Sequence, residues 1–387
     1  MDYLIGSDAI LNSPLQAYST EACAFLGELS RRLMRHPALR QYPDISALAF
    51  WLRGAHLEQM KQECPEREER IGKGLCFHIA PGNVPVNFAF TYAFGLLAGC
   101  ANIVRLPSKP FGQVEPILEC MRELLPQHPE IEMRTAFVRY PVTSDGSEVF
   151  SAKADARLIW GGDSTVAALK AMPTKPRCID IAFADRYSLC VMSGKAITEM
   201  DVLSLQRLAE GFYNDTYMMD QNACSSPQLV LWLNDDGKGR QRFWQALHEH
   251  AISRYQLEDE VCVNKYVQLC QDAIDCKEVE RVIHEDSLLY RAELTAYPKD
   301  ITTKRGQGGY FYEMAVTNLE GLSNVVTEKF QTLTFFGLSP TLLREFVLSH
   351  HLRGIDRIVP VGKAMDIGVF WDGYDLVRML SRRIALM

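Results

Sequence analysis

One cysteine of the sequence lies where a reactive thiol is expected. Cys224 stands in residues 220–228, DQNACSSPQ, a segment of small and polar residues that directly precedes an apolar run. Loops held by a rigid scaffold carry reactive groups, and a thiolate is the best side-chain nucleophile for a thioester. The backbone around Asn222, Ser225 and Ser226 can turn N–H groups toward a developing charge. A buried structural cysteine fits the same segment, so these residues alone leave both interpretations open.

Two turns elsewhere carry groups that suit acyl and cofactor chemistry. Asn83 lies in PGNVP, residues 81–85, where an amide donor to an oxyanion contributes on the order of 3 kcal/mol to catalysis. The alternative for Asn83 is a turn or helix-capping role. Residues 159–166, IWGGDSTV, place Gly161 and Gly162 after a strand and then open a helix, which suits an anion or a nicotinamide. This second turn contains neither G-x-G-x-x-G nor G-x-x-x-x-G-K-[ST], so it is not a familiar nucleotide motif.

The element that positions Asn83 is a long charge-free run. No Asp, Glu, Lys or Arg occurs from Gly74 to Val104, a length that suits a membrane span. Pro81, Gly82 and Pro85 interrupt the run, and polar side chains are scattered through it. We therefore expect a strand, a tight turn, a buried helix and a second strand, which is one βαβ unit of a parallel sheet.

Strands and helices continue to alternate along the chain. Residues 15–70 have helical periodicity and predict an N-terminal helical layer. Apolar runs predict strands at 135–141, 156–162, 178–183 and 187–192, with helices at 115–127 and 163–172. Beyond residue 200 we expect helices at 201–215 and 240–256 and a strand at 227–233. This alternation predicts a doubly wound α/β domain followed by a second α/β domain.

Composition excludes several classes of protein. A chain of 387 residues suggests two domains, and 47% hydrophobic with 23% charged residues is ordinary for a soluble enzyme. A net charge of −7 and the absence of any Lys/Arg-rich block argue against nucleic-acid binding. The eleven cysteines form no C-x-x-C and no cluster with zinc-ligand spacing, so we expect no metal site. With no leader at the N-terminus, we expect free thiols in a reducing cytoplasm.

Taken in order, five segments resemble the aldehyde dehydrogenase superfamily, and more narrowly the acyl-CoA reductase (LuxC) family. The segments are HIAPGNVP, RLPSKP, WGGDSTV, DQNACSSPQ and TEKFQTLT, the last resembling a Glu-x-Phe-Gly-Pro segment. The C-terminal stretch from Gly354 is similar to the tail of that family. The resemblance spans residues 72–387 and implies an α/β fold with a doubly wound cofactor domain and a second α/β catalytic domain.

The resemblance also implies roles for individual residues. Cys224 would be the nucleophile and Asn83 the oxyanion donor. Glu328 would hold the nicotinamide ribose and Phe330 would line the nicotinamide ring. The remaining residues expected to bind the cofactor are Pro81, Ser108, Lys109, Gly161, Gly162, Ser164 and Thr165.

The family layout gives expected boundaries and partners. Residues 1–205 would bind the cofactor and include the helical layer, residues 206–350 would bear Cys224, and residues 351–387 would form a C-terminal return and oligomerisation segment. The resemblance also implies a homo-oligomer, an acyl-CoA or acyl-thioester substrate, and an acyl-protein synthetase as partner.

Two departures from the superfamily pattern bear on the reaction. Oxidising relatives carry a glutamate that activates water, whereas residues 178–190 contain only Asp180 and Asp185 as carboxylates. Without a positioned base, water attacks an acyl-enzyme slowly, so the acyl-enzyme persists until hydride or a thiol reacts with it. This favours reduction of a thioester to an aldehyde. The alternative is that Asp185 acts as a substitute base. Lys109 stands where NAD-preferring relatives have a glutamate, and an ammonium favours the 2′-phosphate of NADPH over NADH; a solvated surface lysine is the alternative. Leu106 replaces a family lysine, with Arg105 as its nearest substitute.

Several alternatives remain open at this stage. His78 is a candidate proton donor, but a lone histidine on an apolar strand is more often a core residue. Residues 211–220, GFYNDTYMMD, suit either an acyl tunnel or ordinary core, and core is the more common use. The rival functions are a semialdehyde or acyl-phosphate dehydrogenase using NADP, a non-redox acyl-carrying subunit, and a structural subunit of a complex.

Overall fold

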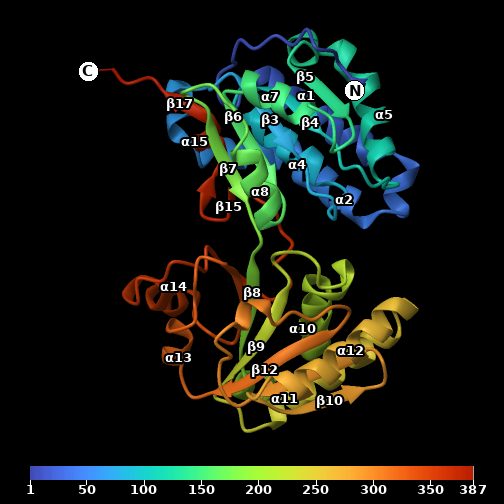
Figure 1. The fold of residues 1–387 in the computed structure, drawn as a ribbon, viewed down its shortest axis with the longest axis vertical. Helices are drawn as coiled ribbons and strands as arrows, with labels where there is room; N and C mark the ends of the chain where they lie inside the picture. The colour runs from blue at the N-terminus through green and yellow to red at the C-terminus, as the bar shows by residue number, and fades with distance from the viewer. Residues whose placement is uncertain (387) are drawn as a thin grey trace. The chain divides into compact units, whose positions relative to one another are not determined.

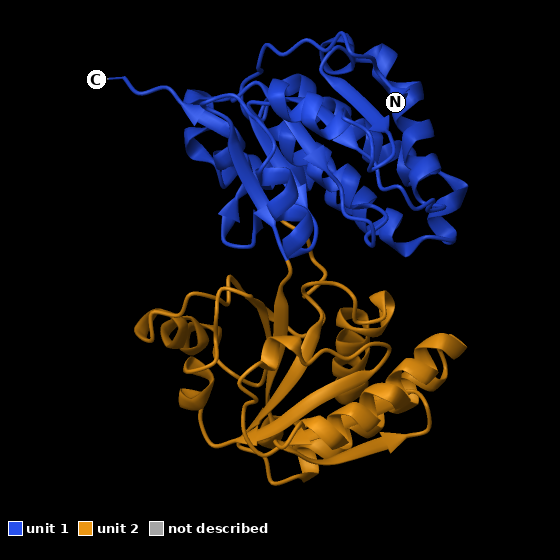
Figure 2. Ribbon diagram, in the orientation of Figure 1, with its two compact units in different colours: residues 1–184, 369–387 blue, residues 185–368 orange. Residues whose placement is uncertain are grey.

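The computed structural model describes residues 1–386 and divides the chain into two compact units (Figure 2). Unit 1 comprises residues 1–184 together with the stretch that begins at Val369, and unit 2 comprises residues 185–368. Each unit is built around its own mainly parallel sheet. The expected pair of α/β bodies is therefore present.

Unit 1 contains a six-stranded sheet with the order β1-β5-β4-β3-β6-β7. Its parallel strands are β3 (Leu75–Ile79), β4 (Ala101–Arg105), β5 (Thr135–Arg139), β6 (Ala156–Trp160) and β7 (Ile179–Phe183), and β1 (Asp2–Ile5) pairs antiparallel with β5. The chain proceeds from β3 outward to β5, then returns to β6 on the other side of β3. This reversal is the switch point of a doubly wound sheet and confirms the predicted topology.

The charge-free run forms the predicted βαβ unit. It contains β3, the turn after it, helix α4 (Asn87–Leu97) and β4, and every residue of α4 is buried. Because α4 is buried on all sides within unit 1, it needs no charged face toward solvent. Among residues 1–386, no helix is long and apolar enough to cross a membrane.

The predicted N-terminal layer contains three helices, of which α1 packs against the other two and against α4 (Figure 1). They are α1 (Thr20–Leu33), α2 (Pro43–Trp51) and α3 (Gly54–Gln62). The ring of Phe25 lies edge-on to Tyr92 of α4, and Trp51 meets Phe90 in the same geometry. The other helices of this part of unit 1 are α5 (Val114–Leu124), α6 (Pro129–Glu132), α7 (Gly146–Lys153) and α8 (Asp163–Lys170).

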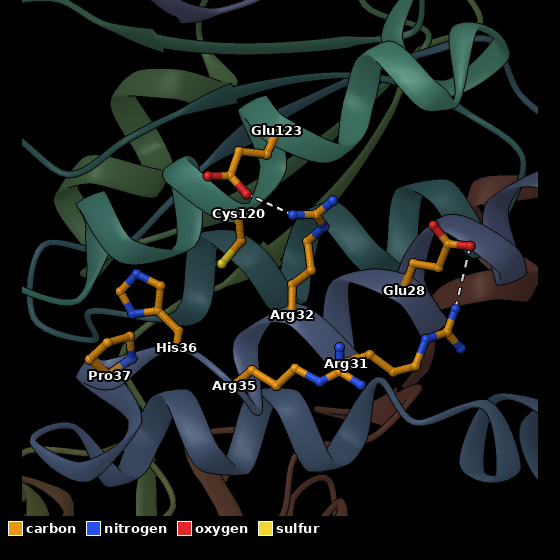
Figure 3. A pocket seen from close by; sticks show the side chains of 8 residues that line it. All are labelled: Glu28, Arg31, Arg32, Arg35, His36, Pro37, Cys120 and Glu123. Atoms are coloured by element: carbon orange, nitrogen blue, oxygen red, sulfur yellow. Dashed lines mark hydrogen bonds and ion pairs between the residues drawn. The ribbon is translucent and has the colours of Figure 1, made fainter.

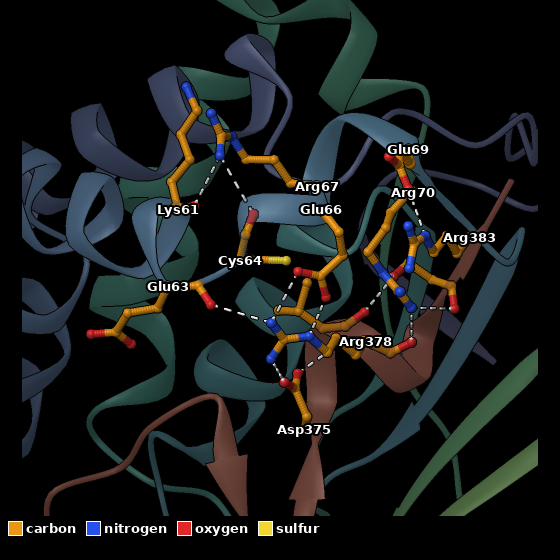
Figure 4. Close-up of polar contacts among 12 residues, drawn as sticks. Lys61, Glu63, Cys64, Glu66, Arg67, Glu69, Arg70, Asp375, Arg378 and Arg383 are labelled. Atoms are coloured by element: carbon orange, nitrogen blue, oxygen red, sulfur yellow. Dashed lines mark hydrogen bonds and ion pairs between the residues drawn. The ribbon is translucent and has the colours of Figure 1, made fainter. Parts of the chain in front are cut away.

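The end of the chain returns to unit 1 through β15 (Phe370–Trp371), β16 (Tyr374–Asp375), α15 (Leu376–Leu380) and β17 (Ser381–Arg383), and β17 pairs with β2 (Arg70–Gly72). Polar contacts hold this return (Figure 4). Arg378 is paired with Glu66 and Asp375, and Arg70 donates to Ser381 Oγ at 2.8 Å. The return therefore begins near residue 369, whereas the sequence placed its start at 351.

Unit 2 contains a seven-stranded sheet with the order β10-β11-β12-β9-β8-β13-β14. All neighbours are parallel except the pair β10–β11. The strands are β8 (Tyr187–Ser193), β9 (Pro227–Leu233), β10 (Val279–Glu285), β11 (Leu289–Leu294), β12 (Tyr310–Val316), β13 (Phe330–Phe336) and β14 (Arg357–Pro360). Its helices are α9 (Gly194–Thr198), α10 (Val202–Asp215), α11 (Lys238–Ile252), α12 (Asp259–Asp275), α13 (Glu320–Ser323) and α14 (Pro340–Ser349).

The boundary between the units lies at residue 184, not at the expected residue 205. The physical reason is β8, which pairs with both β9 and β13 near the middle of the second sheet. A strand that is hydrogen-bonded on both sides belongs to the sheet that satisfies it, so residues 185–205 are part of unit 2.

The aromatic stretch at 211–220 contributes to the core of unit 2. Phe212, Tyr213 and Tyr217 belong to a buried cluster with Phe243 and Trp244. The rings of Tyr213 and Tyr217 are stacked with centroids 5.2 Å apart. The core interpretation is therefore confirmed for these three aromatic residues, whereas Met218 of the same stretch is exposed.

Candidate functional site

Three predicted segments lie at one edge of the unit 1 sheet. The turn with Pro81 and Asn83 follows β3, Ser108 and Lys109 follow β4, and Gly161 follows β6. Since β3 is hydrogen-bonded to both β4 and β6, the carboxyl ends of these parallel strands meet at the same edge. In open α/β sheets this edge, at the switch point, is where ligands bind.

The turn after β6 is open and uncapped. Gly162 is the N-cap of α8, and no side chain accepts a hydrogen bond there. A Cβ built on Gly162 would meet no atom within 4 Å. The side chains of Ser164 and Thr165 are exposed, as is the amide of Asn83 in the turn after β3. Hydroxyl and amide groups, and the uncapped N-terminus of α8, therefore lie at this edge of the sheet.

Two cationic side chains lie at and just after the end of β4. Arg105 Nη2 donates to Ser108 Oγ at 3.4 Å, and the exposed Lys109 has its Nζ 5.4 Å from the centre of the Phe111 ring. Leu106 is buried, with 1% of its surface exposed, so it is part of the core and does not face a ligand. The end of β4, the second strand of the doubly wound set, and the segment after it therefore carry two cationic side chains, Arg105 and Lys109.

His78 is a core residue of unit 1. Its Nε2 donates to Asn102 Oδ1 at 2.9 Å, and its Nδ1 lies 2.8 Å from the Thr91 hydroxyl. Asn102 is held in this orientation because its own amide donates to the Cys100 carbonyl. Burial lowers the pKa of His78 to about 4, so the ring is neutral near pH 7. The core interpretation of His78 is confirmed.

Both carboxylates of residues 178–190 are paired with cations. Asp180 accepts two hydrogen bonds of 2.7 Å from the buried guanidinium of Arg157. Asp185 Oδ2 lies 3.1 Å from Arg305 Nη2 and 3.5 Å from Lys329 Nζ. In unit 1, Asp180 therefore serves a buried ion pair, and in unit 2, Asp185 is engaged by two cations.

Cys224 lies at the amino edge of the unit 2 sheet. It precedes β9 and is close to the beginning of β8, which pairs with β9, and to the beginning of β13, which pairs with β8. Its side chain is partly exposed. Gln331 Nε2 donates to Cys224 Sγ at 3.3 Å, and Ser188 Oγ donates to the Cys224 carbonyl at 2.7 Å. The structure thus fixes both the sulfur and the backbone of the predicted nucleophile.

The loop that bears Cys224 is braced by Gln221. Asp220 and Gln221 have φ angles of 50° and 58°, a left-handed conformation that L-residues adopt only when the surroundings impose it. The buried Gln221 amide accepts from the N–H groups of Gly309 and Tyr310, and it donates to the carbonyls of Pro227 and Tyr310. One side chain therefore ties the loop to β12 and to the beginning of β9.

Six of the other ten cysteines are buried, whereas Cys23, Cys178, Cys262 and Cys270 are partly exposed like Cys224. Burial raises the pKa of eight thiols, which makes each a poor nucleophile near neutral pH: Cys23, Cys64, Cys76, Cys100, Cys120, Cys178, Cys190 and Cys276. Cys262 and Cys270 lie on α12. Cys224 is the thiol that combines partial exposure, a loop position and an amide donor on its sulfur.

Glu328 and Phe330 lie in unit 2 with different surroundings. Glu328 is exposed, and its carboxylate is 3.5 Å from Arg353 Nη2. Phe330 is fully buried and packs on Tyr187, with ring centroids 5.2 Å apart. The predicted contact of Phe330 with a nicotinamide needs an accessible ring face, whereas here the ring is part of the core; that role stays a prediction.

Sequence reasoning missed the residues that hold Cys224. Gln331 and Thr332 follow directly after Phe330 in the quoted segment TEKFQTLT, and Ser188 stands at the beginning of an apolar strand. The signal that was available is Gln331, which occupies the glycine position of the Glu-x-Phe-Gly-Pro pattern. Nothing in the sequence connects Ser188 or Gln221 to the nucleophile.

A hollow of about 460 Å³ lies elsewhere on unit 1 (Figure 3). It is lined by Glu28, Arg31, Arg32, Arg35, His36, Pro37, Cys120 and Glu123. Arg32 is paired with Glu123 at 2.6 Å and Arg31 with Glu28 at 3.4 Å. None of the predicted site residues lines it, so its size does not mark the candidate site.

Comparison with known proteins places these features in a family. The family model described as acyl-CoA reductase (LuxC) matches residues 16–284. This match includes the N-terminal helices that the sequence resemblance left out, and it ends before Glu328, Phe330 and the C-terminal tail. The long-chain acyl-protein thioester reductase of Vibrio harveyi is 28% identical over 167 residues, which cover 42% of this chain and 33% of that protein. The alignment thus spans about a third of the length of the curated relative.

Solved structures show the same fold at low sequence identity. An NAD-dependent benzaldehyde dehydrogenase from Corynebacterium glutamicum has a TM-score of 0.61 at 12% identity, covering 95% of this chain and 85% of its own. A 1-pyrroline-5-carboxylate dehydrogenase from Thermus, solved with bound NAD, has a TM-score of 0.62 at 10% identity, covering 96% and 84%. The fold is therefore that of the aldehyde dehydrogenases.

Proposed function

Because the chain belongs to the acyl-CoA reductase (LuxC) family, we propose that it reduces a fatty acyl thioester to the aldehyde with NADPH, through an acyl group held on Cys224. The family and the fold support an oxidoreductase of the acyl reductase and aldehyde dehydrogenase kind. The thioester substrate is supported by the name of the Vibrio harveyi relative.

The proposal rests on the surroundings of the Cys224 thiol, which is partly exposed and accepts a hydrogen bond from Gln331. The sulfur attacks the thioester carbonyl, a new C–S bond forms, and the bond to the departing thiol breaks. The departing sulfur takes the proton that Cys224 gave up, so an acyl-enzyme and a free thiol result. We propose the Asn83 amide and the Cys224 backbone N–H as donors to the oxyanion of this step.

The two aspartates of residues 178–190 support reduction over hydrolysis. Asp180 is paired with Arg157, and Asp185 is paired with Arg305 and Lys329. Neither carboxylate is therefore placed as a general base that activates water. Without a base from this segment, water attacks the acyl-enzyme slowly. The acyl-enzyme then persists long enough to be reduced.

The residues at the carboxyl edge of the unit 1 sheet fit a nicotinamide nucleotide. The open turn with Gly162, Ser164 and Thr165 offers donors, and Lys109 with Arg105 offers positive charge for a 2′-phosphate. When bound, a reduced nicotinamide would supply hydride to the acyl carbon, and a proton from solvent completes the thiohemiacetal. The C–S bond then breaks as the aldehyde leaves, and the hydroxyl proton of the thiohemiacetal returns to the Cys224 sulfur. The alternative cofactor is NADH.

Mass spectrometry of the intact protein tests the proposal. After incubation with a long-chain acyl-CoA, we expect one acyl adduct on the Cys224 peptide, and addition of NADPH should remove it with release of aldehyde. Cys224→Ala should lose both adduct and product, whereas Cys262→Ala should keep both. Reduction of acyl-CoA by Cys224→Ala would show the central claim to be wrong.

The same assay separates the rival functions. An adduct that persists in the presence of NADPH would favour a non-redox acyl-carrying subunit. Faster turnover of acyl phosphate than of acyl-CoA would favour an acyl-phosphate reductase. An acyl-protein synthetase partner and a homo-oligomer remain proposals, for which transfer of a labelled acyl group from an acylated protein and sedimentation velocity are the direct tests.

A further inference from the structure

A chain of hydrogen bonds in unit 2 ends at the sulfur of Cys224. Arg357 Nη1 donates to Thr332 Oγ1 at 3.4 Å, and Thr332 Oγ1 donates to Gln331 Oε1 at 3.3 Å. Gln331 Nε2 then donates to Cys224 Sγ at 3.3 Å. Gln331 and Thr332 are both fully buried.

The direction of this chain follows from the chemistry of its first member. A guanidinium has only donors, so the Thr332 hydroxyl accepts from Arg357 and directs its own proton elsewhere. That proton meets Gln331 Oε1, which makes the carbonyl end of the amide face Thr332. The NH₂ end of Gln331 therefore faces the sulfur.

Irregular strand pairing explains how neighbouring side chains of β13 meet on one side. The register between β13 and β8 shifts between Phe330 and Leu333, and the register between β8 and β9 shifts between Ser188 and Leu189. Such bulges turn side chains away from strict alternation and are frequent next to active sites. Both irregularities lie beside Cys224.

Ser188 fixes the distance between the loop and β13. Its hydroxyl donates to the Cys224 carbonyl at 2.7 Å and accepts from the Thr332 N–H at 3.2 Å. The backbone of the nucleophile and the backbone of the donor strand are thus connected through one buried side chain. The contact between Gln331 and the sulfur is held from both ends.

We propose that Gln331 is a catalytic residue that stabilises the Cys224 thiolate through its amide N–H, and that Thr332 and Arg357 are positioning residues that orient this amide. The proposal deepens the proposed function and rests on Cys224 being its nucleophile. A neutral amide suits the task because it donates to a thiolate without taking up the proton itself. The same donor assists when the thiohemiacetal collapses, since sulfur again gains negative charge as the aldehyde leaves.

The test measures the thiol directly. Wild-type protein is alkylated with iodoacetamide over a range of pH, and the modified Cys224 peptide is quantified by mass spectrometry, which separates it from the other thiols. Gln331→Met removes the donor at similar volume and should raise the pH midpoint of alkylation by roughly one pH unit. Gln331→Glu should raise it further, because a carboxylate repels the thiolate. Gln268→Met, a partly buried glutamine on α12, should leave the midpoint unchanged.

Two variants of Thr332 test the orienting role. Thr332→Val removes the hydroxyl and should raise the midpoint by less than Gln331→Met does, whereas Thr332→Ser should restore the wild-type midpoint. This pair also decides the question if Gln331→Met fails to fold, because the change in Thr332 leaves the amide in place. An unchanged midpoint in folded Gln331→Met, or equal midpoints for Thr332→Val and Thr332→Ser, would overturn the proposal. Failure of the acyl-adduct assay would leave the alkylation result intact, so the two claims are separable.

Discussion

The two units hold their candidate functional residues in different ways. In unit 1, Asn83, Gly162 and Lys109 lie in exposed turns at the carboxyl edge of the sheet. In unit 2, Cys224 lies at the amino edge, and buried side chains bond its sulfur, its carbonyl and its loop. One site depends on the shape of the backbone, and the other depends on a network of side chains.

The difference corresponds to what each site would have to hold. A nucleotide is large and offers many polar atoms, so several turns that expose N–H groups can share its binding. A nucleophile is a single atom whose position must be held within about 0.5 Å, which requires supporting residues whose own rotamers are locked. We therefore expect substitutions around Cys224 in unit 2 to damage stability and chemistry together, and substitutions at Gly162 and Lys109 in the turns of unit 1 to affect cofactor binding alone.

The largest expected effect is at Gln221. Gln221→Met removes four hydrogen bonds of the nucleophile loop and leaves buried N–H and carbonyl groups unpaired, so we expect a loss of roughly 4 kcal/mol in the free energy of unfolding. Aldehyde formation should fall with it. Urea unfolding and the acyl-adduct assay provide the measurements. The exposed Gln245→Met is the matched control and should change stability by less than about 0.5 kcal/mol. Full activity in Gln221→Met would show that the loop needs no such brace.

The next effect concerns the buried interior of unit 1. His78 is neutral in the folded protein because burial lowers its pKa to about 4, whereas the unfolded chain protonates it near pH 6.5. The unfolded state binds the extra proton, so stability is fully present above pH 6.5 and is lost as the pH falls toward 4. The expected loss is about 3 kcal/mol. Urea unfolding between pH 7 and pH 4 measures it, and His78→Gln should flatten the profile. An equally steep profile in His78→Gln would assign the dependence to other groups.

The smallest effect is at the surface of unit 1. Lys109→Glu replaces an exposed cation after β4 with an anion, and we expect KM for NADPH to rise about tenfold while KM for NADH falls. Unfolding should change by less than about 0.5 kcal/mol, which is the behaviour expected of a turn that only binds. Lys153→Glu, an exposed change at the end of α7, is the control and should leave both KM values as they are. Equal preference in Lys109→Glu and the wild type would remove Lys109 from the cofactor site.

The strands and helices near the site followed from sequence patterns because those patterns are local. The charge-free run gave β3, α4 and β4, since a parallel sheet covered by helices buries continuous apolar segments. The position of β8 did not follow, because hydrophobicity alone does not reveal which sheet a strand joins. The start of the C-terminal return also depends on long-range pairing, in this case between β17 and β2.

By itself the sequence determined the family, the two α/β bodies, and the identity of Cys224 as the thiol in a polar loop before a strand. These depend on residue type and order, which a chain carries before it folds. Only the tertiary structure decided that Gln331 donates to the Cys224 sulfur and that Ser188 holds its carbonyl, because these residues are separated by many positions along the chain and are joined by the pairing of β8, β9 and β13. The tertiary structure also decided that Asp180 accepts two hydrogen bonds from Arg157. Hydrogen-bond partners distant in sequence are set by strand register, and register is a property of the assembled sheet.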